Sequence, residues 1–127
     1  MPRVLIVTEP PVPPEPFRRG LLGLGYSVID EIDDPSRLVK RAISIAPDVI
    51  LIGTESPSKL RLAATAAVEQ HAPYPILVFS ADSDAQRIEQ TVRHGVQSYI
   101  VDGFSARRLP ALIAVARARH AAQHAAA

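Results

Sequence analysis

The chain has no cysteine and no tryptophan, and it contains only three phenylalanines and three tyrosines. The absence of cysteine excludes disulfides, a thiol nucleophile and cysteine-containing zinc sites, and it fits a reducing compartment such as the cytoplasm. The scarcity of aromatic side chains leaves few platforms on which single-stranded nucleic acid could stack. We therefore expect a cytoplasmic protein whose fold needs no covalent cross-links.

A dominant charge and a long apolar run are also absent. The 14 basic and 13 acidic side chains give a formal net charge of +1, so no global field draws the protein to phosphate backbones or anionic lipid. No run reaches the roughly twenty apolar residues that a membrane-spanning helix needs. With 127 residues, of which 47% are hydrophobic, a single domain over 1–127 is expected.

Five short apolar runs alternate with segments long enough to form helices. The runs occupy 4–7, 27–29, 49–52, 76–79 and 99–101. This alternation is typical of βα units and predicts a parallel sheet. The central run has proline on both sides, Pro47 and Pro57, and its continuous apolar character indicates a strand that is covered on both faces.

Apolar spacing predicts helices over 16–25, 35–46, 58–70, 83–95 and 106–124. In the first, Phe17, Leu21 and Leu24 share one face and Gly25 is the expected C-terminal stop. Asp34 before Pro35 is the clearest N-cap. The inward residues expected on the second, third and last helices are Leu38, Val39, Ala42, Ile45, Leu62, Ala66, Val68, Leu109, Leu112, Ile113 and Ala116.

In a doubly wound parallel sheet, ligands gather at the carboxyl ends of the strands. The residues that follow the five runs are therefore the candidate site. They are Thr8 and Glu9, Glu31, Gly53 to Glu55, Ser80 and Ala81, and Asp102 and Gly103.

At these positions the chain resembles a response-regulator receiver domain, the five-stranded α/β switch that is phosphorylated on aspartate in two-component signalling. The resemblance covers nearly every residue. It implies a flavodoxin-like (CheY-like) doubly wound sheet with strand order 2-1-3-4-5 and helices on both faces. Receivers end the first strand with an acidic pair for Mg²⁺, the third with the phosphate-accepting Asp and a Pro four residues later, the fourth with Ser or Thr, and the fifth with Lys-Pro.

Matched onto that pattern, Gly53 stands at the phosphoacceptor position and Asp102 at the lysine position. Glycine supplies no nucleophile, Asp102 reverses the sign of the charge that would pair with the phosphate, and Thr8 weakens the metal site. Glu9 and Ser80 survive in kind. We therefore expect an atypical receiver that has lost aspartyl phosphorylation, is not an enzyme, and needs no metal or cofactor.

A closer resemblance is to the receiver half of nitrate-type ANTAR antitermination regulators. It rests on the segments 48–52, 54–57 and 98–103, in which Asp-Gly replaces the usual Lys-Pro. In that family a helical RNA-binding module follows the receiver and recognises paired hairpins in leader transcripts. This sequence ends at Ala127, just after the helix that would lead into such a module, so the resemblance implies RNA binding only when that module is attached.

Each candidate residue also has an ordinary structural interpretation. Gly53 could form a tight turn, Glu55 could lie in a solvated loop, and Ser80 and Glu9 could cap strand ends. Tyr99 stands where receivers carry an aromatic switch residue, or it packs on the last helix as a strand aromatic. The four histidines make no convincing metal set.

The leading hypothesis is a phosphorylation-independent module that binds a protein partner or a second copy. The fourth helix (83–95), the fifth strand (99–101) and the last helix (106–124) would form the contact surface, which includes Tyr99 and Arg107. The arginines of the last helix could contact RNA phosphates or a partner's carboxylates, or they could be solvated. No small-molecule substrate is expected.

The alternative function is a small-ligand sensor or enzyme that uses an acidic crevice at the strand ends. Its candidate ligand-binding residues are Glu9, Glu55, Ser80 and Asp102.

Overall fold

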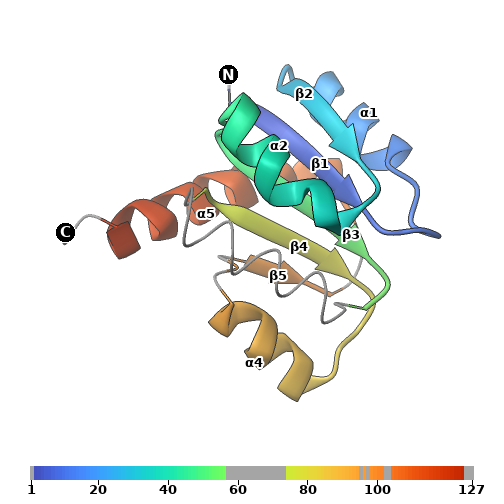
Figure 1. The fold of residues 1–127 in the computed structure, drawn as a ribbon, viewed down its shortest axis with the longest axis vertical. Helices are drawn as coiled ribbons and strands as arrows, with labels where there is room; N and C mark the ends of the chain where they lie inside the picture. Colours follow the sequence, from blue (N-terminus) through green and yellow to red (C-terminus); the bar gives the residue numbers. More distant parts are fainter. Residues whose placement is uncertain (1, 57–73, 95, 97, 102–103, 125–127) are drawn as a thin grey trace.

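The computed structural model describes residues 2–56, 74–94, 96, 98–101 and 104–124. Their strands form one parallel sheet in the order β2-β1-β3-β4-β5 (Figure 1). The strands are β1 (Arg3–Thr8), β2 (Ser27–Ile32), β3 (Val49–Thr54), β4 (Ile76–Ser80) and β5 (Ser98–Ile100). The predicted flavodoxin-like fold and its strand order are therefore confirmed.

Helices cover both faces of this sheet (Figure 1). The described helical elements are α1 (Glu15–Gly23), η1 (Pro35–Arg37), α2 (Leu38–Ile45), α4 (Ala85–Arg93), η2 (Ala106–Arg108) and α5 (Leu109–His124), where η marks a 3-10 turn. The helix expected over 58–70, with Leu62, Ala66 and Val68, lies outside the described residues.

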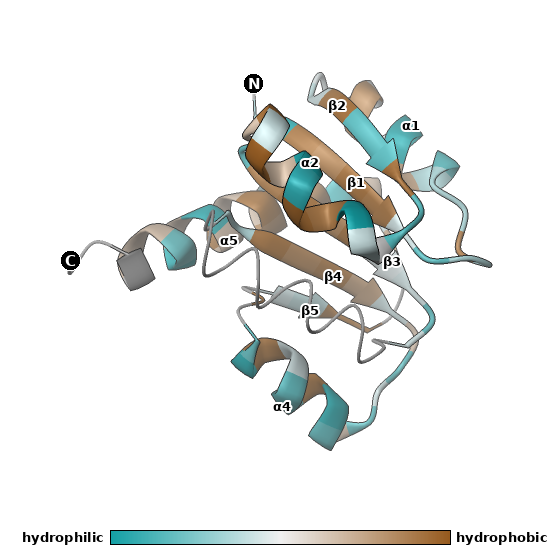
Figure 2. Ribbon diagram, viewed as in Figure 1, coloured by the Kyte–Doolittle hydropathy of each residue, from teal (hydrophilic) through white to brown (hydrophobic). Residues whose placement is uncertain are grey.

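The hydrophobic core consists of two layers separated by the sheet. Alternate residues of one strand face opposite layers, so Val4 and Ile6 of β1 join the layer under α1 and α5, whereas Leu5 and Val7 join the layer under α2. All six residues of β3 are buried, and Figure 2 shows the apolar character of β1 and β4. Burial on both faces explains the continuous apolar runs of the sequence.

For the predicted helices that lie within the described residues, the inward faces are confirmed with one exception. Leu38 and Ala42 of α2, and Leu109, Ile113 and Ala116 of α5, are buried, and Val39, Ile45 and Leu112 pack against them. Leu24 was expected to face inward but is 36% exposed. Helix α1 ends at Gly23, so Leu24 is its C-cap and no longer follows the helical face.

The predicted helix starts are partly corrected. The Asp34 carboxylate accepts a hydrogen bond from the Ser36 amide at 3.0 Å, but it caps the short turn η1. Helix α2 begins only at Leu38, where Arg37 is the N-cap and makes no side-chain hydrogen bond. The helix expected over 83–95 begins at Ala85, and the carboxylate of its N-cap Asp84 accepts from the Arg87 amide.

A pair of glycines at the end of α1 gives a test of this local structure. Gly25 has a positive φ of 87°, whereas an added Cβ on Gly23 would meet no atom within 4 Å. We expect Gly25→Ala to lower the free energy of unfolding by about 1–2 kcal/mol, because alanine is strained in the left-handed region. Gly23→Ala should raise it by roughly 0.5 kcal/mol. Urea denaturation measures both, and equal effects would contradict the assignment.

Candidate functional site

The strand register brings the predicted site residues together. Gly53 pairs with Thr8 of β1 on one side and with Phe79 of β4 on the other, and Thr54 pairs with Ser80. The amide of Glu9 donates to the carbonyl oxygen of Gly53 at 3.0 Å. The candidate acceptor position therefore lies between the carboxyl ends of the first and fourth strands. Asp102 and Pro57, which belong to the same pattern, lie outside the described residues.

The space that a side chain at position 53 would need is occupied by Phe17. A Cβ built on Gly53 would lie 2.7 Å from Cε2 and 2.9 Å from Cζ of Phe17, and 3.3 Å from Cγ1 of Val12. Phe17 lies in the first turn of α1, and its ring is buried. Glycine at this position thus accommodates the close approach of another side chain, which the sequence alone did not indicate.

Phe17 belongs to a cluster of all three phenylalanines of the chain. Its ring centroid lies 5.6 Å from that of Phe79 and 4.9 Å from that of Phe104, and the last two are 5.8 Å apart. The two contacts of Phe104 have the edge-to-face geometry that aromatic pairs prefer. The cluster joins α1, the end of β4 and the segment that precedes η2 by apolar packing.

Gly20 of α1 also makes room for this cluster. A Cβ on Gly20 would lie within 2.8 Å of Cε1 of Phe104. The helix therefore accepts the Phe104 ring against its backbone.

The polar groups beside this cluster are engaged with one another. The Thr54 hydroxyl lies 3.1 Å from Oε1 of Glu9 and 3.0 Å from the carbonyl oxygen of Ser56, so it can donate to either. The Ser80 hydroxyl donates to the carbonyl oxygen of Glu55 at 2.9 Å and accepts from the Asp82 amide at 3.1 Å. Ser80 and Glu9 thus take part in hydrogen bonds that tie the ends of β1, β3 and β4 together.

The residues around Gly53 do not fit the Mg²⁺ site that the receiver fold implies. Mg²⁺ is held through carboxylate oxygens and water in octahedral geometry. Glu9 is the carboxylate next to this position, Thr8 is a buried residue that supplies only a hydroxyl, and the Phe17 ring fills the space over Gly53. Among the described residues, no group of three histidine or carboxylate side chains could hold a metal ion.

A polar network centred on Asp82 links the neighbouring strand ends. Its Oδ2 accepts from the Ser56 hydroxyl at 2.6 Å and from Nη1 of Arg87 at 2.8 Å, and its Oδ1 accepts from the Asp84 amide at 3.0 Å. The Tyr99 hydroxyl donates to the Asp82 carbonyl oxygen at 2.8 Å. Asp82, in the turn that follows β4, therefore connects the end of β3, the first turn of α4 and β5.

The network shifts the pKa values of its members. Hydrogen bonds from Ser56 and from Arg87 lower the pKa of Asp82 to about 2, and the Asp82 carboxylate raises the pKa of Arg87. Burial raises the pKa of Tyr99. At neutral pH the carboxylate is charged and the phenol is protonated, which are the states that these hydrogen bonds need.

Tyr99 does not pack in the way that its ordinary interpretation required. Its ring packs against the core layer under α2, which lies on the opposite face of the sheet from the layer under α5. Its hydroxyl points to the turn before α4. The tyrosine therefore bridges β5 and the Asp82 network.

In the described part of the chain, predicted site residues line two cavities at this edge of the sheet. One, of about 170 Å³, has Glu55 and Ser80 in its lining, but its other walls include the three phenylalanines and Val12. The walls beside Glu55 and Ser80 are thus largely apolar, unlike the acidic crevice that the alternative function assumed.

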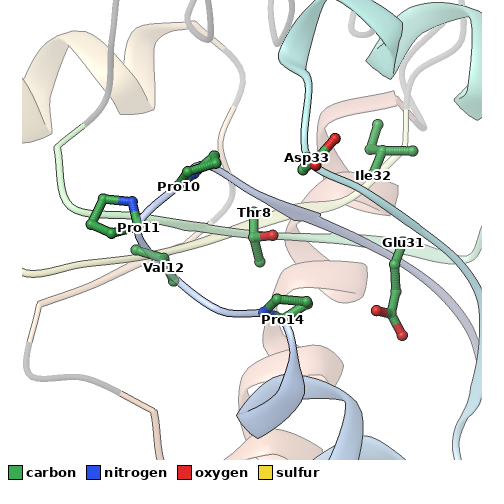
Figure 3. Close-up of a pocket in the computed structure, with 8 residues that line it drawn as sticks. All are labelled: Thr8, Pro10, Pro11, Val12, Pro14, Glu31, Ile32 and Asp33. Atoms are coloured by element: carbon green, nitrogen blue, oxygen red, sulfur yellow. The ribbon is translucent and has the colours of Figure 1, made fainter.

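The other cavity, of about 370 Å³, lies between the prolines that follow β1 and the end of β2 (Figure 3). Thr8 stands between its two sides, which are formed by Pro10, Pro11, Val12 and Pro14 and by Glu31, Ile32 and Asp33. Glu31, which was expected after the second strand, lies within β2 because that strand extends to Ile32. Its carboxylate is 2.7 Å from Nε of Arg18.

Comparison with known proteins identifies the fold. The chain is 36% identical over 94 residues to the transcriptional regulatory protein KdpE of Staphylococcus aureus, which covers 74% of the chain and 41% of that protein. No protein-family model matches the chain.

The solved structures that superpose on this chain include two receiver domains that it covers almost completely. The signal receiver domain of a modulated diguanylate cyclase from Desulfovibrio desulfuricans superposes with a TM-score of 0.83 at 22% identity, covering 98% of this chain and 99% of that one. The response regulator domain of Thermotoga maritima CheB gives a TM-score of 0.69 at 21% identity, covering 94% and 96%. This chain has the receiver fold.

The receiver-fold site contains residues that sequence reasoning missed. The phenylalanine cluster could not be predicted from helical spacing. That spacing indicates that Phe17 faces inward, but it does not indicate which residues Phe17 contacts. A signal was present, since the chain has only three phenylalanines and one of them, Phe79, ends a predicted strand. Asp82 had no periodic pattern to mark it.

The packing of Phe17 on Gly53 can be tested by a double-mutant cycle. We expect Gly53→Ala to lower the free energy of unfolding by about 1–3 kcal/mol, because the added methyl overpacks a buried contact. Replacing the ring by Phe17→Leu should relieve the overlap, so the double variant should be more stable than the sum of the single effects by at least about 0.5 kcal/mol. Urea denaturation measures the four proteins, and additive effects would contradict the contact.

The Asp82 network predicts a specific acid sensitivity. The pKa of the Asp82 carboxyl is about 2 in the folded protein, below the ordinary value of 3.8. The carboxylate therefore stabilises the fold fully above about pH 4, and this contribution is lost as the pH falls towards 2. Asp82→Asn should lower stability at neutral pH and flatten its fall between about pH 4 and pH 2. Chemical denaturation of the two proteins across this range measures the slopes, and equal slopes would contradict the role of the Asp82 carboxylate.

Proposed function

We propose that this chain is a receiver-like signalling module that works by protein contact and does not accept a phosphoryl group. The observation that carries the proposal is the Phe17 ring beside Gly53. An acyl phosphate needs a carboxylate nucleophile, room for three phosphoryl oxygens and positive charge around them. The acceptor position has no side chain and its surroundings are aromatic, which supports the loss of this chemistry.

The Asp82 network supports a module whose surface is set without phosphate. Ser56, Arg87 and Tyr99 each bind one residue of the turn after β4. These hydrogen bonds connect β3, α4 and β5, the elements between which a phosphoryl-dependent change would have to pass. Because the groups that bind Asp82 belong to the chain itself, the arrangement of α4 and β5 needs no added ligand.

The proposed contact surface comprises α4, β5 and α5. Exposed apolar side chains support it, since Val92 of α4 is 48% exposed and Val115 of α5 is 42% exposed. Tyr99 and Arg107 line the same region. A protein partner or a second copy of the chain would cover these side chains.

The regulatory context is proposed from the relatives. The chain spans about 41% of the length of KdpE, whose name describes a transcriptional regulator. We propose that this module controls gene expression in the cytoplasm when an output module is attached, and that an ANTAR-type RNA-binding module would make the output antitermination. Among the described residues, no helix combines the length and apolar character that crossing a membrane requires.

Incubation with acetyl phosphate and Mg²⁺ tests the proposal. We expect no phosphoryl group on the intact protein by mass spectrometry, because position 53 offers no carboxylate. A receiver domain with an aspartate acceptor, treated in parallel, provides the positive control. Stoichiometric phosphorylation that hydroxylamine removes would show that another carboxylate takes the phosphoryl group and would overturn the proposal.

A further inference from the structure

The charges of this chain are divided along the sequence. Residues 103–127 contain four arginines and no acidic residue, whereas residues 1–102 contain ten basic and thirteen acidic side chains. The near-neutral whole is therefore an acidic body with net charge −3 and a basic C-terminal segment with net charge +4. Helix α5 carries two of the four arginines, Arg117 and Arg119, and Arg107 and Arg108 lie in η2 directly before it.

A groove of about 630 Å³ runs between α5 and β5. Its lining on the strand side is 98–101, and on the helix side it includes Arg107, Ala111, Val115 and Arg119. These four recur at intervals of four residues, so they form one stripe with a basic residue at each end and small or apolar residues between. The lining within the described residues contains no acidic side chain.

The strand that forms the other side of the groove lies at the edge of the sheet. Within the described part of the chain, β5 pairs only with β4 (Figure 1). The backbone groups of an outer strand edge are available to a further extended segment, which gains main-chain hydrogen bonds and places alternate side chains to one face.

We propose that this groove binds an extended acidic segment of a partner protein, added along β5. The segment's carboxylates would meet the arginines at the two ends of the stripe, and apolar side chains would cover Val115 between them. Arg107 and Arg119 are twelve residues apart, roughly 18 Å along a helix, which five or six residues of extended chain span at about 3.3 Å each. The inference rests on the proposed contact surface and names the partner's chemistry.

The charges favour such a partner over a second copy or RNA. Two copies that met groove to groove would bring their arginines together without a carboxylate in the lining, which is unfavourable at short distance. RNA binding depends mainly on many phosphate contacts, but the lining also contains Ile100, Leu112 and Val115. Apolar side chains and an open strand edge match a protein segment.

Fluorescence anisotropy with capped hexapeptides tests the inference on the full chain. The probe alternates glutamate and valine, and the controls alternate lysine and valine or contain glutamate alone. We expect saturable, salt-sensitive binding of the glutamate–valine peptide, weaker binding of the glutamate peptide and none of the lysine–valine peptide. Amide NMR shifts should localise to 98–101 and α5.

Matched charge reversals give the decisive comparison. Arg107→Glu lies in the groove lining, whereas Arg117→Glu makes the same charge change on an exposed part of α5 outside it. We expect the first to weaken binding about tenfold or more and the second about twofold or less, with unchanged circular dichroism in both. Val115→Ser should also weaken binding, because it removes the apolar contact and leaves the charge.

Three outcomes would overturn the inference. They are no saturable binding of the glutamate–valine peptide, equal effects of the two reversals, and a hairpin RNA that binds through Arg107 while the peptide does not. Phosphorylation by acetyl phosphate would instead contradict the proposed function, whether or not the peptide binds. A failed peptide titration with an unphosphorylated chain would remove only the acidic-partner inference.

Discussion

The structure depends on the close packing of the Phe17 ring against Gly53. A glycine inside a buried strand normally weakens it, since no side chain is there to pack. Here the missing side chain is replaced by a ring from α1, which also contacts Phe79 and Phe104. The edge of the sheet where receivers keep charged groups is therefore held by apolar contacts, and these do not change with the attachment or loss of a phosphoryl group.

The Asp82 network provides the polar counterpart of this packing. It ties Ser56, Arg87 and Tyr99 to one turn, and the pKa of about 2 keeps its carboxylate charged at neutral pH. The phenylalanine cluster and the Asp82 network connect different elements. The rings join α1 and the segment before η2, whereas Asp82 joins α4 and β5. Under the proposed function, a binding partner with different affinities for two conformations would shift the module between them.

The sequence predicted the fold well because apolar residues recur with the spacing of strands and helices. Continuous apolar runs such as 49–52 mark strands covered on both faces, and Leu38 with Ala42 marks an inward helix face. It predicted where Gly53 would lie, because parallel strands end at one edge. It did not predict what covers Gly53, since which ring reaches across from another helix depends on tertiary geometry. Asp82 was missed for a similar reason, because its partners come from three separate elements.

The proposed loss of phosphoryl-acceptor chemistry and the survival of the fold would have one physical explanation. Clustered carboxylates repel one another and resist desolvation, so a phosphorylation site of that kind lowers the stability of the scaffold that carries it. The two core layers consist of apolar residues, including those of β1 and β3, and their packing does not depend on clustered carboxylates at the strand ends. Once acceptor chemistry is not required, Phe17 can occupy the space and remove buried polar surface. The same exchange makes reversal difficult, because an aspartate at position 53 would have to displace a ring that is packed on two others.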